Sequence, residues 1–377
     1  MKKFIKKIIW FLLPFLAILT VPSYILFSYS ESFINIDALI LNKEQKKLIG
    51  YAHNENNYKY LKWKTVESSD RADVMVLGSS RVLQFRSTMF TSSFYNAGYT
   101  INNVEDFQLF FNSIPKNKYP KILLIGLDQW IFNPNWNNYL PIKNSNHWKS
   151  SFSVFPKGNV LFKTYADLFK GKVDFTPPKD TLNNSIIKIG MNAHINNKGF
   201  RNDGSMMYGT QINKLLNKDI IANDFNFNNT LGRIKKGKNP FEYGDRFNEN
   251  IMSKLDSFLN FCSKNDVFVV AISPPFANRV YSEMSNSLNY MYLDYIESEC
   301  SNLFKNYKYE YYNISHNNVV DLNDDGNIDG FHGGEVVYLK MLIHILENDS
   351  KLNKYSNLIQ LNKDLKSPVN PYLVYPY

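Results

Sequence analysis

Short apolar runs alternate with amphipathic stretches along most of the chain beyond residue 71. The runs at residues 72–77, 121–127 and 267–272 do not alternate with polar residues, which is typical of strands buried on both faces. Shorter strands are predicted at residues 93–96 and 309–314. This pattern predicts an α/β fold in which helices flank a parallel sheet of about five strands.

Helices are predicted between these strands, where apolar residues recur at three- and four-residue spacings. One is expected at residues 104–113, and a second begins at Asp245, the expected N-cap. Further helices are predicted at about residues 283–304 and 335–346. The βα alternation therefore extends almost to the end of the chain.

The regular alternation stops between residues 128 and 244, a range dominated by Asn, Lys, Pro and Gly that we interpret as a long insertion. Residues 31–70 lack strong strand patterning and are predicted to be a stalk or connector. Residues 350–377, rich in Asn and Lys, are expected to form a peripheral tail. The α/β domain, with the insertion inside it, is thus expected to span residues 71–349.

The N-terminus has the pattern of a membrane anchor. Four lysines within the first seven residues precede an uncharged stretch at residues 8–30, and about 20 apolar residues in a helix suffice to cross a bilayer. No small-residue cleavage site precedes Glu31, so residues 1–30 are interpreted as an uncleaved transmembrane anchor; a cleaved, secreted protein is the alternative. The positive-inside rule then predicts a single-pass protein whose remaining chain is extracytoplasmic.

The net charge and the cysteine content limit the classes of partner and ligand that the protein is expected to bind. The formal net charge is +9, which by itself suits nucleic acid, an anionic membrane surface or an anionic polymer. The expected extracytoplasmic location argues against nucleic acid. Cys262 and Cys300 are the only cysteines, and two buried free thiols are favoured over a disulfide. Neither has a metal-ligand spacing around it, so no structural zinc site is expected.

Three separated segments carry candidate chemistry: Gly78-Ser79-Ser80-Arg81, Asn96-Ala97-Gly98 and Asp329-Gly330-Phe331-His332. Ser80 follows the first strand, and open α/β sheets bind ligands at the carboxyl ends of their strands. A serine nucleophile needs a base, which His332 would supply, and Asp329 would orient that histidine. The three residues are therefore predicted to form one catalytic unit.

Structural alternatives exist for each segment taken alone. The segment at residues 78–81 fits a strand-to-helix turn with a capping serine. In the third segment, Asp329-Gly330 fits a β-turn beside an exposed histidine. Residues 321–329 also follow the oxygen-ligand spacing of a calcium loop, but the twelfth position is His332, a poor ligand for a hard cation. The order of the segments along the chain favours the catalytic interpretation, without a metal or a cofactor.

These segments, in this order, resemble the membrane-anchored SGNH/GDSL hydrolase-like family over about residues 70–346. Gly-Ser-Ser in place of Gly-Asp-Ser is similar to the variant in the teichoic-acid D-alanylation protein (DltD) and alginate O-acetylation protein branches. The resemblance implies an SGNH-hydrolase-like, flavodoxin-like sheet and serine acyl chemistry. It also implies that the backbone amides of Ser80 and Gly98 form an oxyanion hole.

The third family segment departs from the family pattern. Where the family carries Gly-x-Asn-Asp, this chain has Gly126-Leu127-Asp128-Gln129. An asparagine amide donates to an oxyanion, whereas an ionised aspartate cannot. The hole would therefore rest on Ser80 and Gly98 unless Asp128 is protonated or Gln129 replaces it.

Charged residues near these segments are candidates for substrate binding. Arg81 lies beside the predicted nucleophile, and Arg201 and Asp203 lie in the insertion; an arginine can clamp an anionic or carbonyl group. Surface salt bridges are the alternative for both arginines. The basic stretch from Arg233 to Lys238 suits an anionic glycan, although an exposed linker explains it equally simply.

The resemblance implies O-acyl transfer, with acetyl as the expected group, onto a cell-surface glycan. The related anchored proteins work beside a membrane-bound O-acyltransferase, which is the expected partner together with the lipid bilayer. Two alternatives remain open: a glycan or lipid esterase with the same triad, and a non-catalytic glycan-binding or assembly scaffold.

Overall fold

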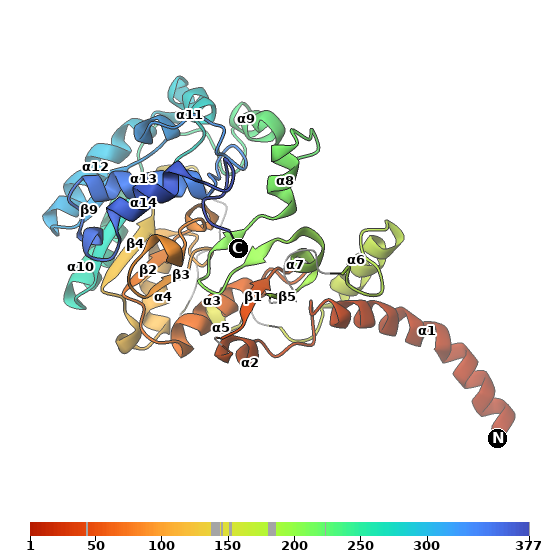
Figure 1. The fold of residues 1–377 in the computed structure, drawn as a ribbon. Helices are drawn as coiled ribbons and strands as arrows, with labels where there is room; N and C mark the ends of the chain where they lie inside the picture. The colour runs from red at the N-terminus through yellow and green to blue at the C-terminus, as the bar shows by residue number, and fades with distance from the viewer. Residues whose placement is uncertain are drawn as a thin grey trace. The chain divides into compact units, whose positions relative to one another are not determined.

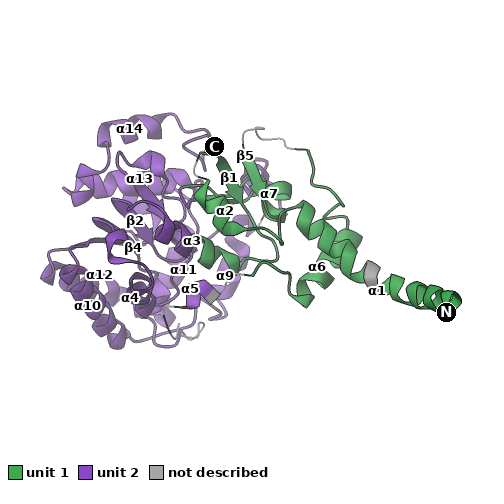
Figure 2. Ribbon diagram, turned by 90° about the horizontal axis from the view of Figure 1, so that it is seen from below, with its two compact units in different colours: residues 1–61, 151–202, 206–210 green, residues 62–150, 203–205, 211–377 purple. Residues whose placement is uncertain are grey.

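The computed structural model describes residues 1–42, 44–136, 144, 146–150, 153–179, 186–222 and 224–376 (Figure 1). The chain forms two compact units, which are described separately (Figure 2). Unit 1 comprises residues 1–61, 151–202 and 206–210, and unit 2 comprises residues 62–150, 203–205 and 211–377.

Unit 2 is built on a five-stranded parallel sheet with the order β3-β2-β4-β8-β9. The strands are β2 (Val74–Leu77), β3 (Phe94–Asn96), β4 (Ile122–Gly126), β8 (Phe268–Ser273) and β9 (Glu310–Asn313). All residues of β2 and β4 are buried, as expected for central strands covered on both faces. The predicted α/β class with a parallel sheet flanked by helices is confirmed.

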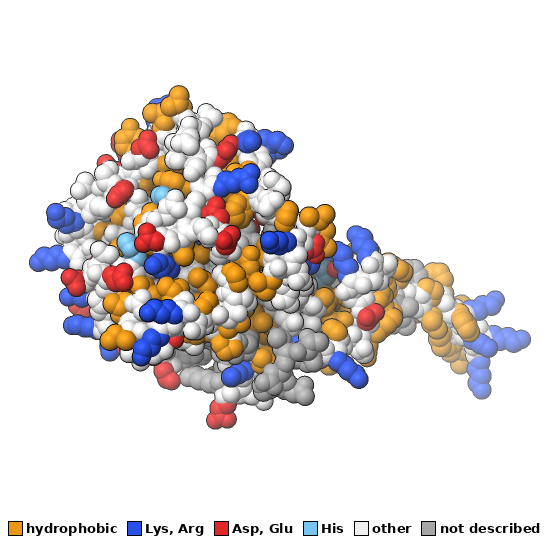
Figure 3. Space-filling view, turned by 45° about the horizontal axis from the view of Figure 1, so that its top comes forward, with side chains coloured by type: hydrophobic (Ala, Val, Ile, Leu, Met, Phe, Trp, Pro, Cys, Tyr) orange, Lys and Arg blue, Asp and Glu red, His pale blue; other side chains and the backbone are white. Residues whose placement is uncertain are grey.

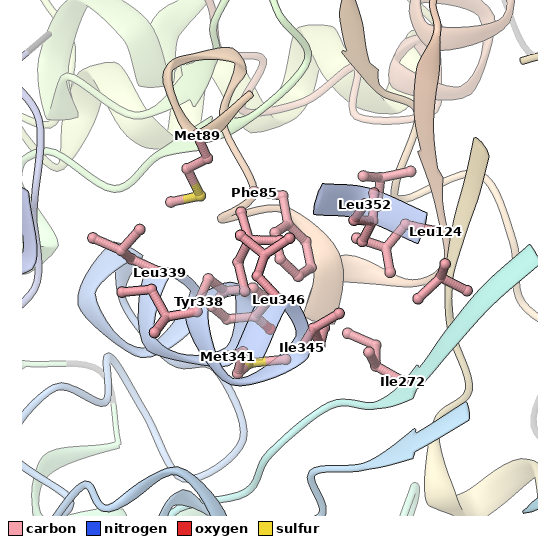
Figure 4. Packing of buried hydrophobic residues seen from close by; sticks show 14 of the residues in the cluster. Phe85, Met89, Leu124, Ile272, Tyr338, Leu339, Met341, Ile345, Leu346 and Leu352 are labelled. Atoms are coloured by element: carbon pink, nitrogen blue, oxygen red, sulfur yellow. The ribbon is translucent and has the colours of Figure 1, made fainter. Parts of the chain in front are cut away.

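One face of this sheet packs against the last long helix. Alternate strand residues, such as Val76, Leu124 and Ile272, form a buried cluster with Leu339 and Leu342 of helix α13 (Glu335–Glu347) (Figure 4). The strand residues between them are buried too, and helix α10 (Glu249–Lys264) contacts β8. Helix α4 (Val104–Ser113) packs on α10, with the rings of Phe107 and Phe258 stacked at 5.2 Å between their centres.

The helices of unit 2 include those predicted at residues 104–113 and 335–346 and several that the sequence did not predict. Those that the structure describes are α4 (Val104–Ser113), α5 (His147–Ser150), α9 (Asn228–Ile234), α10 (Glu249–Lys264), α11 (Asn278–Ser285), α12 (Leu293–Asn306), α13 (Glu335–Glu347) and α14 (Leu358–Lys366). Two more, α3 (Asn57–Ser68) and α8 (Thr210–Leu216), include residues of both units. The helix predicted from Asp245 begins later, with Asn248 as its N-cap.

The single helix predicted at residues 283–304 is wrong. The structure has two helices, α11 and α12, separated by a 3-10 turn at Leu288–Tyr290. The side chain of Ser287 accepts a hydrogen bond from the Asn289 backbone amide and so starts this turn. Serine and asparagine side chains compete in this way with helical hydrogen bonds, which apolar periodicity alone does not register.

Unit 1 contains a second, four-stranded sheet with the order β5-β1-β6-β7. Its strands are β1 (Lys46–Ile49), β5 (Ile186–Ile189), β6 (Gly199–Phe200) and β7 (Met206–Met207). Strand β1 lies in the range predicted to be a stalk, and it pairs in parallel with β5 from the predicted insertion. The stalk therefore contributes a strand to a folded unit, and only four residues, two of them lysines, carried the sequence signal.

The helices of unit 1 are α1 (Lys2–Ser28), α2 (Ile36–Leu41), α6 (Gly158–Phe169) and α7 (Met191–Asn196). Within the described residues, no single helix combines the length and apolar composition needed to cross a membrane. The segments Lys2–Pro14 and Ile18–Ser28 of α1 meet that requirement only as a pair, and they are bent by 50° relative to each other.

The C-terminal segment is an integral part of unit 2, in contrast to the predicted peripheral tail. Leu352, Leu361 and Val374 are buried in the cluster beneath α13. The Glu335 carboxylate accepts hydrogen bonds from the amides of Val374 and Tyr375 at 3.1 and 3.2 Å. The Arg86 guanidinium donates to Glu335 at 3.0 Å and to the carbonyl oxygen of Tyr375 at 3.1 Å. The tail contributes only backbone groups to these bonds, so its polar composition gave no sign of them.

Candidate active site

Ser80 lies at the carboxyl end of β2, between the two halves of the sheet. Strand β3 lies on one side of β2, and β4, β8 and β9 follow on the other, so the chain reverses its winding direction between β2 and β4. Such a switch point is where doubly wound sheets bind ligands. Gly78, with φ of 156°, makes the tight turn that follows β2, and the Ser79 side chain caps the 3-10 turn Ser80–Val82.

The three residues predicted to form a catalytic unit lie in hydrogen-bonding contact. Ser80 Oγ is 2.9 Å from His332 Nε2. On the other side of the ring, His332 Nδ1 is 2.8 Å from Asp329 Oδ2 and 2.9 Å from Oδ1. This is the arrangement in which a histidine takes the proton of a serine hydroxyl while a carboxylate fixes the ring.

Asp329 is held as an ionised acceptor. Burial by itself would raise its pKa, but the neighbouring His332 and the hydrogen bonds from the backbone amides of Phe331 and His332 outweigh burial, and the pKa lies below its usual value. At neutral pH the carboxylate therefore accepts the Nδ1 proton of His332, which leaves Nε2 to accept from Ser80.

The lowered pKa of Asp329 predicts a pH dependence of stability. A carboxyl group whose folded pKa lies below the unfolded value stabilises the fold above the unfolded pKa, about 3.9, and this contribution disappears as the pH falls through the folded pKa. We expect the wild type to exceed Asp329→Asn in free energy of unfolding at neutral pH and to lose that margin below about pH 4. Urea unfolding of both proteins between pH 7 and pH 2.5 measures the margin; a constant margin would contradict the assignment.

Arg81 is not a substrate clamp, contrary to the sequence-based prediction. Its side chain is fully buried, and its guanidinium donates to Asp128 Oδ1 at 3.2 Å, Gln129 Oε1 at 2.6 Å and the carbonyl oxygens of Pro274 at 2.7 Å and Phe331 at 3.0 Å. It also lies 4.0 Å from the centre of the Phe276 ring. Arg81 thus positions the segment that carries His332 relative to the turn that carries Ser80.

The predicted oxyanion hole is only partly available. The Gly98 amide donates to Asn96 Oδ1 at 2.9 Å, so it is not a free donor in this structure, contrary to the expectation. Asp128 accepts from Arg81; burial raises the pKa of Asp128 above its usual value, and Arg81 opposes that rise only in part. Gln129 donates to the carbonyl oxygen of Pro274 at 3.0 Å and does not replace the missing asparagine.

The remaining amide of the predicted hole is that of Ser80 itself. Among the residues that the structure describes, none accepts a hydrogen bond from the Ser80 N–H. It lies at the first position of the 3-10 turn, where backbone amides have no partner within the turn. Of the predicted oxyanion donors, the Ser80 amide is therefore the one that can donate to a ligand in this structure.

Arg201 and Asp203 have structural contacts. Arg201 belongs to unit 1, where its Nη1 donates to the carbonyl oxygen of Met206 at 2.9 Å. Asp203 belongs to unit 2, and its carboxylate accepts from the Ser87 amide at 2.8 Å and from the Ser205 hydroxyl at 2.6 Å. Both side chains are used to hold turns, and the structure does not bring Arg201 and the triad together within one unit.

Two residues of the predicted insertion lie beside the loop that carries His332. Arg233 of α9 lies 5.1 Å from the centre of the Phe331 ring, next in sequence to His332, and 5.4 Å from that of Phe241. Asp224 accepts from the Gly330 amide at 3.0 Å and so ties the insertion to the loop between Asp329 and His332. The basic stretch pointed to Arg233, whereas nothing in the sequence singled out Asp224.

The other sequence candidates lie away from this chemistry. Cys262 and Cys300 are both free and buried, and burial raises the pKa of both thiols. The Asp324 carboxylate accepts from the amides of Asn278 and Arg279, so it caps α11. Across the described ranges, no group of three or more His, Cys, Asp or Glu side chains is arranged to hold a metal ion.

The chain matches no known protein-family model, and no curated protein matches it. Its chemistry is therefore argued from the geometry of the site, in which one serine, one histidine and one aspartate form a continuous hydrogen-bonded chain at a switch point of the sheet.

Proposed function

We propose that this protein is a serine O-acyltransferase related to the membrane-anchored SGNH/GDSL hydrolase-like family. The observation that carries the proposal is the chain of short contacts from Ser80 Oγ through His332 to Asp329. The strand order of unit 2 supports the family proposal, because it corresponds to the 2-1-3-4-5 order of flavodoxin-like folds.

The geometry suits a two-step reaction through an acyl-enzyme. In the first step Ser80 Oγ attacks the acyl carbonyl carbon while His332 Nε2 takes the hydroxyl proton and then delivers it to the departing oxygen of the donor. In the second step a sugar hydroxyl attacks the acyl-serine and gives its proton to His332, which returns it to Ser80. Asp329 stabilises the imidazolium in both steps, and the Ser80 amide donates to the developing oxyanion.

Transfer is preferred over hydrolysis because of the proposed anchor. If α1 holds the protein in the membrane with the remaining chain extracytoplasmic, the site stays close to lipid-linked or membrane-delivered acyl groups, which raises their effective concentration. A membrane-bound O-acyltransferase is the proposed supplier of the acyl group, acetyl in the simplest case, and a cell-surface glycan is the proposed acceptor.

A serine-directed fluorophosphonate tests the catalytic part of the proposal. It should label the wild type and spare Ser80→Ala; labelling at another serine would refute the assignment. The acceptor is tested by comparing surface glycans of a deletion strain and its parent by mass spectrometry and NMR. Loss of O-acyl groups in the deletion strain is expected, whereas their accumulation would identify an esterase with the same triad.

One observation favours a second candidate, a non-catalytic glycan-binding scaffold. The Gly98 amide donates to Asn96, and Asp128, which accepts from Arg81, stands where the family pattern has an asparagine donor, so two of the donors expected for the oxyanion hole are missing. The scaffold predicts that glycan binding survives Ser80→Ala and that no acyl-enzyme forms with any activated ester. Covalent capture of an acyl group on Ser80 would exclude it.

The position of Arg233 favours a negatively charged substrate. Its guanidinium lies over the rings of Phe331 and Phe241, and its Nη1 donates a 3.3 Å hydrogen bond to the carbonyl oxygen of Asn239. We expect Arg233→Met to raise KM for an anionic glycan roughly ten- to hundredfold with little change in kcat, because a charged hydrogen bond contributes about 1.5–3 kcal/mol.

The exposed Lys236 provides the control for this prediction, since Lys236→Met removes the same charge from the same basic stretch. Steady-state kinetics at two salt concentrations should show a small, salt-sensitive change for Lys236→Met. Equal effects of the two substitutions would mean that only the general charge of the stretch matters.

A further inference from the structure

Unit 1 exposes four phenylalanines on one short segment. Phe155, Phe162, Phe169 and Phe175 are between 51% and 83% exposed, and all lie within residues 153–179, which include α6. Elsewhere in the described part of unit 1 beyond α1, Leu41 is 66% exposed, whereas Ile187 and Ile195 are each only 37% exposed. Such a concentration of exposed aromatic rings indicates a surface that meets an apolar environment.

This segment packs directly on the C-terminal half of α1. Ile25, Leu26 and Tyr29 share a buried cluster with Val160 and Val173, which flank or belong to α6. Both ribbon views show α6 beside α1 within unit 1 (Figures 1 and 2).

Hydrogen bonds join the same two segments. Ser28 Oγ donates to the carbonyl oxygen of Phe175 at 2.9 Å, and the Tyr29 hydroxyl donates to that of Thr176 at 3.1 Å. Phe27, next to this contact, is 63% exposed. The exposed rings are therefore fixed to the end of α1 by both packing and hydrogen bonds.

The segment at residues 153–179 also carries an excess of basic side chains. Residues 153–179 contain five lysines and two aspartates, and Lys157, Lys163 and Lys170 are exposed close to the phenylalanines in sequence. Helix α1 has the same combination, with apolar side chains along its length and lysines at its N-terminal tip (Figure 3). Exposed phenylalanines accompanied by lysines are typical of helices that lie in the membrane interface.

We propose that residues 153–179 form a second membrane contact, in which α6 lies in the headgroup region of the bilayer. The exposed phenylalanines enter the acyl boundary, and the lysines remain at the level of anionic headgroups. This inference rests on the proposed membrane anchor, because α6 is fixed to the end of α1 that would leave the bilayer. Unit 1 would then rest on the membrane surface instead of hanging from a flexible tether.

Site-directed spin labelling of the full-length protein in vesicles of phosphatidylcholine and phosphatidylglycerol tests the proposal. The two native cysteines are buried, so the label goes to an introduced one, and unlabelled wild type confirms this. Labels at Phe162→Cys and Phe169→Cys should collide more often with oxygen than with a water-soluble nickel chelate. A label at Ser253→Cys, on an exposed position of α10, should show the reverse.

A label at Leu12→Cys in α1 separates this proposal from the anchor. If the Leu12 label is lipid-exposed while those at positions 162 and 169 are as aqueous as Ser253, the anchor stands and the second contact is refuted. If the Leu12 label is aqueous as well, both are refuted. Strong dipolar broadening between labels at position 169 of different molecules would instead show a second copy on this surface and would also overturn the proposal.

Discussion

Ser80→Ala should abolish acyl transfer and covalent labelling while leaving the fold intact. The substitution removes the hydroxyl oxygen that contacts His332 and leaves the hydrophobic core intact, so the free energy of unfolding should change little. Turnover should fall by about 10⁴- to 10⁶-fold, as when a serine nucleophile is removed from other triads. Transfer of acetyl from an activated ester, followed by intact-protein mass spectrometry, measures both turnover and the acyl-enzyme.

The partner residues provide the test of concerted action. His332→Ala should match the loss in Ser80→Ala, and Asp329→Asn should lower kcat by about 10⁴-fold because the histidine loses its orienting carboxylate. The Ser80→Ala/His332→Ala double variant should cost little beyond either single one. Additive losses would show that the residues act independently. Ser79→Ala should still be labelled by a fluorophosphonate, which identifies Ser80 as the reactive serine.

Arg81→Met should be the most destabilising single substitution at the site. It removes four hydrogen-bond donations from a fully buried guanidinium and leaves the Asp128 carboxylate buried without its cation. Breaking a buried ion pair from one side typically costs about 3–5 kcal/mol in the free energy of unfolding. Denaturant unfolding in detergent, followed by circular dichroism, measures that loss.

A double variant distinguishes charge from packing in this cluster. Arg81→Met/Asp128→Asn removes both charges and should recover part of the stability lost in Arg81→Met, since no uncompensated charge remains buried. Arg81→Lys keeps the charge but not the planar fork and should fall between the wild type and Arg81→Met. A wild-type unfolding curve for Arg81→Met would contradict the positioning role.

The meeting of Ser80 and His332 was predictable from the sequence because it follows from the topology of the sheet. Parallel strands joined by helices bring their carboxyl ends to one edge, so a serine after the first strand and a histidine just before α13 meet there. Asp329 was predictable because a spacing of three residues on a turn lets its carboxylate reach the imidazole. These inferences needed only strand order and short-range geometry.

The finer contacts depend on tertiary structure and were not predictable. The sequence could not show that the Gly98 amide is taken by Asn96, because the Asn96 side chain is held in place by the carbonyl oxygens of Val82 and Phe85. Nor could it show that Arg81 points inward, because its partners Pro274 and Phe331 lie far along the chain. Strand β1 was missed because its partner β5 lies about 140 residues away in the chain. Local pattern reports propensity, whereas these features arise from long-range pairing.

The contacts of Arg86 and Glu335 with residues 372–376 connect parts of unit 2 that are far apart in the sequence. These residues supply backbone amides and carbonyl oxygens to the two side chains, which join the helical turns after Ser80 to the helix after His332. The segment that follows Ser80 is thus joined to residues almost 300 positions later, and such non-local contacts form only after the entropy of closing a long loop has been lost. A truncation that removed residues 372–376 would leave Arg86 and Glu335 without these backbone partners.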